Sequence, residues 1–166
     1  MYKKFFVFLG ILTAVYIIWI LGLNWVYAYM LKFGVAFFTA SAKTIATNIE
    51  KLSDGQPEFQ LIINGARARI PIEPLILPFV LILAWQIFIF IYFPRKLATK
   101  ATLLNLSVFY ILQVFYLLLF LSQGKYVLLE KLKLIFPNSF TIIAFFFIVK
   151  DYFLFMKPQQ QINQTK

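Results

Sequence analysis

The residues that could do chemistry in this chain are few. It contains six Asp and Glu residues, no Cys and no His. Thiol catalysis, disulfides and thiolate metal sites are therefore excluded, and the commonest general base and metal ligand is missing. Five of the carboxylates fall in two polar connecting segments, at no spacing that suggests a pair for acid–base work. We expect no catalytic residue, no cofactor and no metal site, and hence a protein that is not an enzyme.

A few polar residues interrupt the apolar segments of the chain. Gln86, Asn105 and Gln113 are interpreted as residues that hydrogen-bond between helices, because a transport pathway normally carries ionisable groups deep in a bilayer. Lys150 and Asp151 come closest to such groups. They lie one to two turns from the end of an apolar segment, where Lys can extend to the membrane surface and Asp can pair with a neighbour. A structural role is favoured for both.

The composition indicates a membrane protein. Of 166 residues, 62% are hydrophobic and only 13% are charged, about half of the charged fraction of soluble domains. The apolar residues form long blocks, as in proteins that cross a bilayer several times. We predict one all-α integral membrane domain over 1–166, with four transmembrane helices, a small extracytoplasmic β-hairpin and amphipathic helical segments. The predicted spans cover residues 5–27, 74–93, 103–121 and 140–155.

The distribution of positive charge predicts the orientation of these spans. The formal net charge is +10, which favours membrane anchoring and contact with lipids over binding to nucleic acid. Segments 1–4, 94–100 and 156–166 hold seven Lys and Arg residues and no acidic one. Basic residues concentrate in short cytoplasmic segments of membrane proteins. Both termini are therefore expected in the cytoplasm, and the region 28–73 outside it.

Residues 58–72 predict the β-hairpin. Asn64-Gly65 is a strong signal for a two-residue turn, because both positions tolerate a positive φ. Folding the chain there places apolar residues on one face of the ribbon and mostly polar residues on the other, with Glu58 diagonal to Arg69. The expected pairs are Ile63–Ala66, Leu61–Ala68, Phe59–Ile70, Ile62–Arg67 and Gln60–Arg69.

Residues 30–52 predict a helix with one apolar stripe. Leu31, Val35, Phe38, Ala42, Ile45, Ile49 and Leu52 recur at spacings of three and four. Two interpretations remain open: the helix lies in the headgroup region or packs on a partner, or it continues the first span out of the membrane and packs on the hairpin. Gly34 is the place where a bend is expected. A second amphipathic segment is expected around 128–136, and the tail 157–166 is expected to be disordered.

The order of these features resembles a known family. A basic N-terminus, one span, an amphipathic stretch, a strand pair and the segment PIEPLILPFVLILA that opens the second span resemble the exosortase H-associated membrane proteins, over roughly residues 1–93. Exosortases are membrane transpeptidases that use Cys, Arg and His, so this chain cannot be one. The resemblance implies an accessory role in a bacterial inner, or cytoplasmic, membrane.

The predicted function is therefore that of a non-catalytic accessory or scaffold subunit of a membrane protein-sorting or envelope assembly system. The expected partners are membrane lipids and an integral membrane protein, with no nucleic acid, and a homo-oligomer is compatible with the sequence. A small transporter, or the membrane subunit of a transport complex, is the alternative, and an intramembrane enzyme acting on lipid-like substrates is a third. The candidate partner-binding residues are Val35, Phe38, Ile45, Ile49, Arg67 and Arg69.

Overall fold

The computed structural model describes residues 2–40, 45–52, 55–63, 66–71, 73–120, 135 and 138–154. The elements are, in chain order, α1 (Tyr2–Ile18), a π-helical segment η1 (Trp19–Leu23), α2 (Asn24–Thr39), β1 (Ile45–Lys51), β2 (Pro57–Ile63), β3 (Ala66–Pro71), α3 (Glu73–Tyr92) and α4 (Arg95–Leu119). Residues 138–154 are helical as well and are called the C-terminal helix below.

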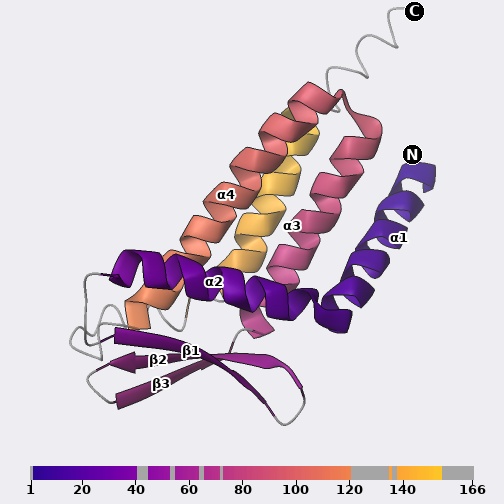
Figure 1. The fold of residues 1–166 in the computed structure, drawn as a ribbon. Helices are drawn as coiled ribbons and strands as arrows, with labels where there is room; N and C mark the ends of the chain where they lie inside the picture. The colour runs from indigo at the N-terminus through magenta and orange to yellow at the C-terminus, as the bar shows by residue number, and fades with distance from the viewer. Residues whose placement is uncertain are drawn as a thin grey trace, which may run out of the picture.

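The helices form a bundle with one helix lying across it. α1, α3, α4 and the C-terminal helix run along the bundle, and α2 crosses their lower ends (Figure 1). The sheet lies below α2, so that α2 separates it from much of the bundle. We call this the sheet end of the bundle. The opposite end, where α1 begins and α3 passes into α4, is called the far end.

A break at Gly22 turns the chain from α1 into α2. Gly22 has φ 148° inside the π-helical segment, a conformation that residues with a Cβ rarely adopt. The first predicted span, 5–27, thus covers most of α1, the break and the first turn of α2. The chain does not bend at Gly34, the position where the sequence allowed a bend. Gly34 lies within regular helix, where a Cβ would come within 2.6 Å of Val114 Cγ2, so its missing side chain lets α2 approach α4.

Two helical stretches among the described residues are long and apolar enough to cross a membrane. They are Tyr2–Thr39, taken through the break, and Arg95–Leu119. A third stretch, Leu77–Tyr92, is a shorter apolar helix. α3 agrees with the predicted bounds 74–93 to within one residue at either end. α4 begins eight residues before the predicted 103, because the Arg- and Lys-containing turn ahead of the apolar run also favours helix.

The predicted hairpin is confirmed in its register. β2 and β3 are antiparallel, and all five expected pairs are observed, including Phe59 with Ile70 and Gln60 with Arg69. The Arg69 Nε atom lies 3.9 Å from Glu58 Oε2, as the diagonal pairing predicted. On the apolar face, Phe59, Leu61 and Ile70 are fully buried. The turn at 64–65 lies outside the described residues.

The helix predicted over 30–52 is wrong in its second half. Residues Ile45–Lys51 form β1, which pairs antiparallel with β2, so the described strands make a sheet in the order β1-β2-β3. Ile45 and Ile49 are four residues apart, a spacing that places two side chains on one face of a helix and also of a strand. The β-branched residues of this segment favour the strand, and pairing with β2 supplies backbone hydrogen bonds. The fold is thus mostly helical with a small sheet, and the predicted all-α class holds only for the bundle.

Candidate functional site

A carboxylate lies buried among three helices toward the far end of the bundle. Asp151, on the C-terminal helix, is 1% exposed. Its Oδ2 accepts hydrogen bonds from Asn105 Nδ2 on α4, at 2.7 Å, and from Trp85 Nε1 on α3, at 3.2 Å. One acidic side chain therefore connects α3, α4 and the C-terminal helix. We call Trp85, Asn105, Lys150 and Asp151 the Asp151 cluster.

Lys150 balances the charge of this carboxylate. Its Nζ atom lies 3.2 Å from Asp151 Oδ1 and donates a hydrogen bond of 2.6 Å to Asn105 Oδ1. The Lys150 side chain is 28% exposed, so its ammonium group lies at the border between the cluster and the surface. A buried carboxylate needs such a partner and hydrogen-bond donors, since an unpaired buried charge is costly. The expectation that Asp151 pairs with a neighbour is confirmed, and that neighbour is Lys150.

The three polar residues interpreted as contacts between helices do connect helices. Asn105 belongs to the Asp151 cluster, and Gln86 on α3 accepts a hydrogen bond from Thr102 Oγ1 on α4 at 3.0 Å. Gln113 on α4 donates to the Leu75 carbonyl oxygen of α3 at 3.0 Å and accepts from the Tyr27 hydroxyl group of α2. Among the described residues, the Gln86 Nε2 atom is a buried donor without a hydrogen-bond partner.

These polar residues do not form an open path through the described part of the bundle. Gln86, Asn105, Gln113 and Asp151 are each at most 1% exposed. Asn105 and Gln113 are two helical turns apart on α4, and Gln113 bonds to Tyr27 and Leu75 instead of to the Asp151 cluster. The polar groups are thus used in packing, with their hydrogen bonds directed from helix to helix.

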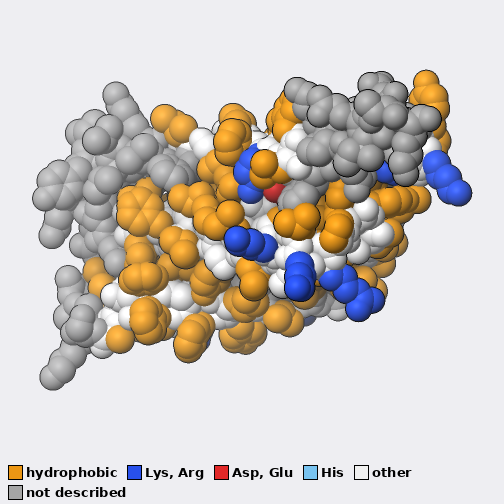
Figure 2. Space-filling model, turned by 90° about the horizontal axis from the view of Figure 1, so that it is seen from above, with side chains coloured by type: hydrophobic (Ala, Val, Ile, Leu, Met, Phe, Trp, Pro, Cys, Tyr) orange, Lys and Arg blue, Asp and Glu red, His pale blue; other side chains and the backbone are white. Residues whose placement is uncertain are grey.

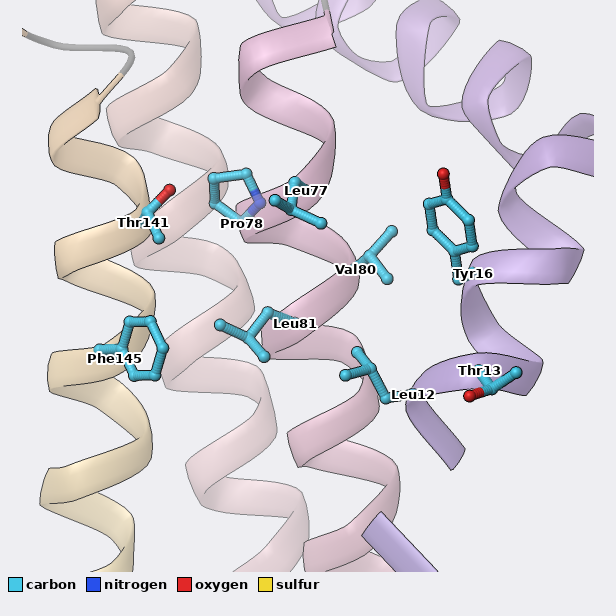
Figure 3. Close-up of a pocket in the computed structure, with 9 residues that line it drawn as sticks. All are labelled: Leu12, Thr13, Tyr16, Leu77, Pro78, Val80, Leu81, Thr141 and Phe145. Carbon is cyan, nitrogen blue, oxygen red and sulfur yellow. The ribbon is translucent and has the colours of Figure 1, made fainter. Parts of the chain in front are cut away.

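An apolar groove opens between α1, α3 and the C-terminal helix (Figure 3). Its volume is about 390 Å³. Leu12 and Tyr16 line it from α1, Pro78 and Leu81 from α3, and Phe145 from the C-terminal helix. The Thr13 hydroxyl group, also in the lining, donates to the Leu9 carbonyl oxygen within its own helix. The groove therefore offers mainly hydrocarbon surface, which suits an apolar chain and no polar substrate.

The predicted partner-binding residues do not form one surface. Val35 is fully buried in α2, whereas Phe38 on the same helix is 61% exposed. Ile45 and Ile49 are partly buried on β1 and pack against the main core. Arg67 and Arg69 are exposed on β3. The single helical stripe that was to join the first four residues does not exist.

The structure instead groups aromatic side chains on the outer side of α2. Phe33, Phe37 and Phe38 are all exposed, while Leu31 and Val35 face the core. The stripe interpretation included Phe38 but missed Phe33 and Phe37, because it also assigned Val35, on the inward face of α2, to the partner. The sequence analysis also missed the role of Trp85 as a hydrogen-bond donor to Asp151. A signal was present, because a buried Trp Nε1–H group needs an acceptor and Asp151 is the one acidic residue within a predicted apolar segment.

The described residues contain no group of three or more His, Cys, Asp or Glu that could hold a metal ion. No protein-family model, no curated protein and no solved structure matches the chain.

Proposed function

We propose that the chain is an integral membrane protein with four spans and acts without catalysis, as an accessory or scaffold subunit of a membrane protein-sorting or envelope assembly system. α1, α3, α4 and the C-terminal helix are the spans of this proposal, and α2 with the sheet lies on the extracytoplasmic side. The resemblance to exosortase H-associated proteins suggests the kind of system.

The outer surface of the bundle supports a membrane location. Large hydrophobic side chains are exposed along every bundle helix, with Leu9 on α1, Ile91 on α3, Ile111 on α4 and Ile142 on the C-terminal helix as examples. Hydrophobic side chains also cover much of the face seen in Figure 2. So much exposed apolar surface is unfavourable in water but suits lipid tails. α3 has 20 residues and a length of about 30 Å, the thickness of the hydrocarbon core of a bilayer.

The charges at the far end support the orientation. Lys3 and Lys4 begin α1, and Arg95, Lys96 and Lys100 lie in the first turns of α4. Lys and Arg side chains are also grouped among hydrophobic ones on the face shown in Figure 2. Basic residues favour the cytoplasmic side. We therefore propose that the protein lies in a bacterial inner membrane with its far end facing the cytoplasm and its sheet end on the outer side.

The exposed aromatic group of α2 is the observation that carries the accessory role. Phe33, Phe37 and Phe38 are exposed on α2, the helix that crosses the bundle (Figure 1). The opposite face of α2 is already buried by packing within the protein. Protein interfaces take much of their binding energy from a few large aromatic anchors. The outer face of α2 therefore replaces the predicted stripe as the proposed partner-binding surface, with Arg67 and Arg69 of β3 as further candidates.

The transporter alternative has one observation in its favour. The Asp151–Lys150 pair is an ionisable pair near the far end, and ionisable residues within membrane helices often mark ion or proton paths. Because the hydrogen bonds of Asp151 and Asn105 are directed to neighbouring helices, we favour the accessory function.

Photocrosslinking in native membranes tests the proposal. A photoreactive amino acid replaces Phe37 or Phe38 on α2, and Ile142, exposed on the C-terminal helix, serves as the matched lipid-facing control. We expect the α2 positions to crosslink one defined membrane protein and the control to give no such product. Phe38→Ser should weaken co-purification of that protein several-fold, whereas Ile142→Ser should not.

Two results would contradict the proposal. If Phe38→Ser keeps every partner while Asp151→Asn alone abolishes function in the cell, the transporter alternative gains the support instead. The orientation is checked separately, since the chain has no Cys. A single cysteine at Gly55 should react with an impermeant thiol reagent in intact cells, and one at Thr99 only after permeabilisation. The reverse labelling would show that the orientation is wrong.

A further inference from the structure

A second groove lies beside the Asp151 cluster, between α4 and the C-terminal helix. Its volume is about 350 Å³. Leucine side chains from both helices line much of it, namely Leu97, Leu104 and Leu154. The polar residues of its lining are Lys100, Lys150 and Asp151. The groove thus combines hydrocarbon surface with two ammonium groups, unlike the apolar groove of Figure 3.

The charges of this groove are arranged for an anion. Asp151 is buried and already accepts hydrogen bonds from Trp85 and Asn105, so its carboxylate faces the bundle interior. Lys150 is held by Asp151 and Asn105 but remains partly exposed. Lys100 is exposed and has no hydrogen-bond or ion-pair partner among the described residues. With two ammonium groups and one carboxylate, the groove has a formal charge of +1.

We propose that this groove binds one anionic phospholipid. Lys100 and Lys150 contact the phosphodiester group, and an acyl chain lies along the leucine side chains. The inference rests on the membrane location proposed above, because a lipid reaches this groove only from a bilayer. Lys side chains near a membrane surface attract anionic lipids, and basic pockets between membrane helices on the cytoplasmic side bind anionic headgroups.

The same features favour an anionic lipid over related ligands. A lipid with a single negative charge balances the +1 of the groove, whereas a zwitterionic lipid brings no net charge and adds an ammonium group beside Lys100 and Lys150. A soluble phosphate would use the two lysines but leave the leucine surface uncovered. Both differences predict a preference that can be measured.

The test uses the full-length purified protein in detergent and native mass spectrometry. The probes are phosphatidylglycerol and phosphatidylethanolamine with identical acyl chains, and inorganic phosphate. We expect retention of one phosphatidylglycerol molecule in preference to phosphatidylethanolamine, and no displacement by inorganic phosphate. Lys100→Gln should lower the phosphatidylglycerol affinity roughly five-fold.

The matched control is Lys96→Gln. Lys96 lies one turn earlier on α4, carries the same charge and does not line the groove. It should keep the phosphatidylglycerol preference. Lys100→Gln is the decisive variant, because Lys150→Gln also removes a partner of Asp151 and can unfold the far end. A stable Leu104→Asn variant, which alters the acyl-chain surface alone, should weaken retention of the lipid as well.

Three results would overturn the lipid site. Equal retention of the two lipids would remove the charge argument, equal losses in Lys96→Gln and Lys100→Gln would indicate surface charge without a groove, and displacement by inorganic phosphate would identify a soluble ligand. Any of these leaves the membrane location standing if the protein stays in the membrane pellet after alkaline carbonate extraction. Release into the supernatant would overturn the membrane location and, with it, the lipid site.

Discussion

At the sheet end, α2 is fixed to the bundle by aromatic packing and neutral hydrogen bonds, whereas toward the far end a buried carboxylate holds three helices together. At the sheet end Tyr27 stacks on Phe79, with ring centroids 4.0 Å apart, and the Tyr110 hydroxyl group donates to the Met30 carbonyl oxygen at 2.7 Å. At the far end Asp151 pairs with Lys150 and accepts from Trp85 and Asn105. A single substitution is therefore expected to be most harmful at the far end.

The physical reason is the cost of a polar group left without its partner. A neutral donor or acceptor that loses its partner costs about 1–3 kcal/mol when buried, and a buried charge costs more. The far end therefore depends strongly on one side chain. At the sheet end, many aromatic rings and a close contact between helices share the stabilisation of the packing.

The largest effect is expected from Asp151→Ala. The change removes the acceptor of Trp85 Nε1 and Asn105 Nδ2 and the counter-charge of Lys150. We expect a loss of about 2–4 kcal/mol in the free energy of unfolding. This is less than the usual cost of removing one partner of a buried ion pair, because the Lys150 ammonium group can still reach water. SDS-induced unfolding in a mild detergent measures it. Asp151→Asn is the control, since it keeps an acceptor oxygen and should lose much less. Equal losses would show that charge, and not hydrogen bonding, holds the far end.

A smaller effect is expected from Gly34→Ala at the sheet end. The new Cβ would come within 2.6 Å of Val114 Cγ2 and would also meet the Tyr110 hydroxyl group, so α2 must move away from α4. Overpacking of this kind costs about 1–3 kcal/mol. Gly10→Ala is the matched control, because its Cβ would meet no atom within 4 Å. It should stabilise α1 by about 0.5–1 kcal/mol. The same unfolding assay compares both, and a stable Gly34→Ala variant would contradict the close contact of α2 and α4.

The smallest effect is expected from Arg69→Gln on the outer face of the sheet. The Arg69 side chain is 64% exposed and lies 3.9 Å from Glu58. An exposed ion pair contributes less than about 1 kcal/mol, and salt screens it. Thermal unfolding at low and high salt should therefore show a small difference that disappears at high salt. Arg67→Gln, without an ion-pair partner among the described residues, should show none. A large loss in Arg69→Gln would mean that this face of the sheet is covered and not exposed to solvent.

The comparison of predicted and observed strands shows how far local sequence reaches. The β2–β3 register followed from the Asn64-Gly65 turn signal and from period-two alternation, both of which are local. β1 was predicted as helix, because Ile45 and Ile49 fit either period and the residues that decide between them belong to β2. The choice between helix and strand depends on a partner strand some ten residues away. The periodicity of the segment itself holds no information about that partner.

The site shows the same division. The sequence contained Asp151, Lys150 and the three amides, and it suggested that they serve packing. It could not show that Asp151 and Trp85, 66 residues apart, meet across two helices. An apolar stripe does not show which surface it packs against. For this reason the interpretation of the sequence also assigned the inward face of α2 to a partner.

The apolar helices, their approximate bounds, the hairpin register and the absence of Cys and His chemistry could be inferred from the amino-acid sequence. These properties follow from composition, from local periodicity and from turn residues. The tertiary structure alone decided that the chain breaks at Gly22, that Gly34 admits a neighbouring helix and that β1 joins the sheet. It also decided which polar groups are buried together. Those outcomes depend on close packing and paired hydrogen bonds between distant segments, which exist only once the chain has folded.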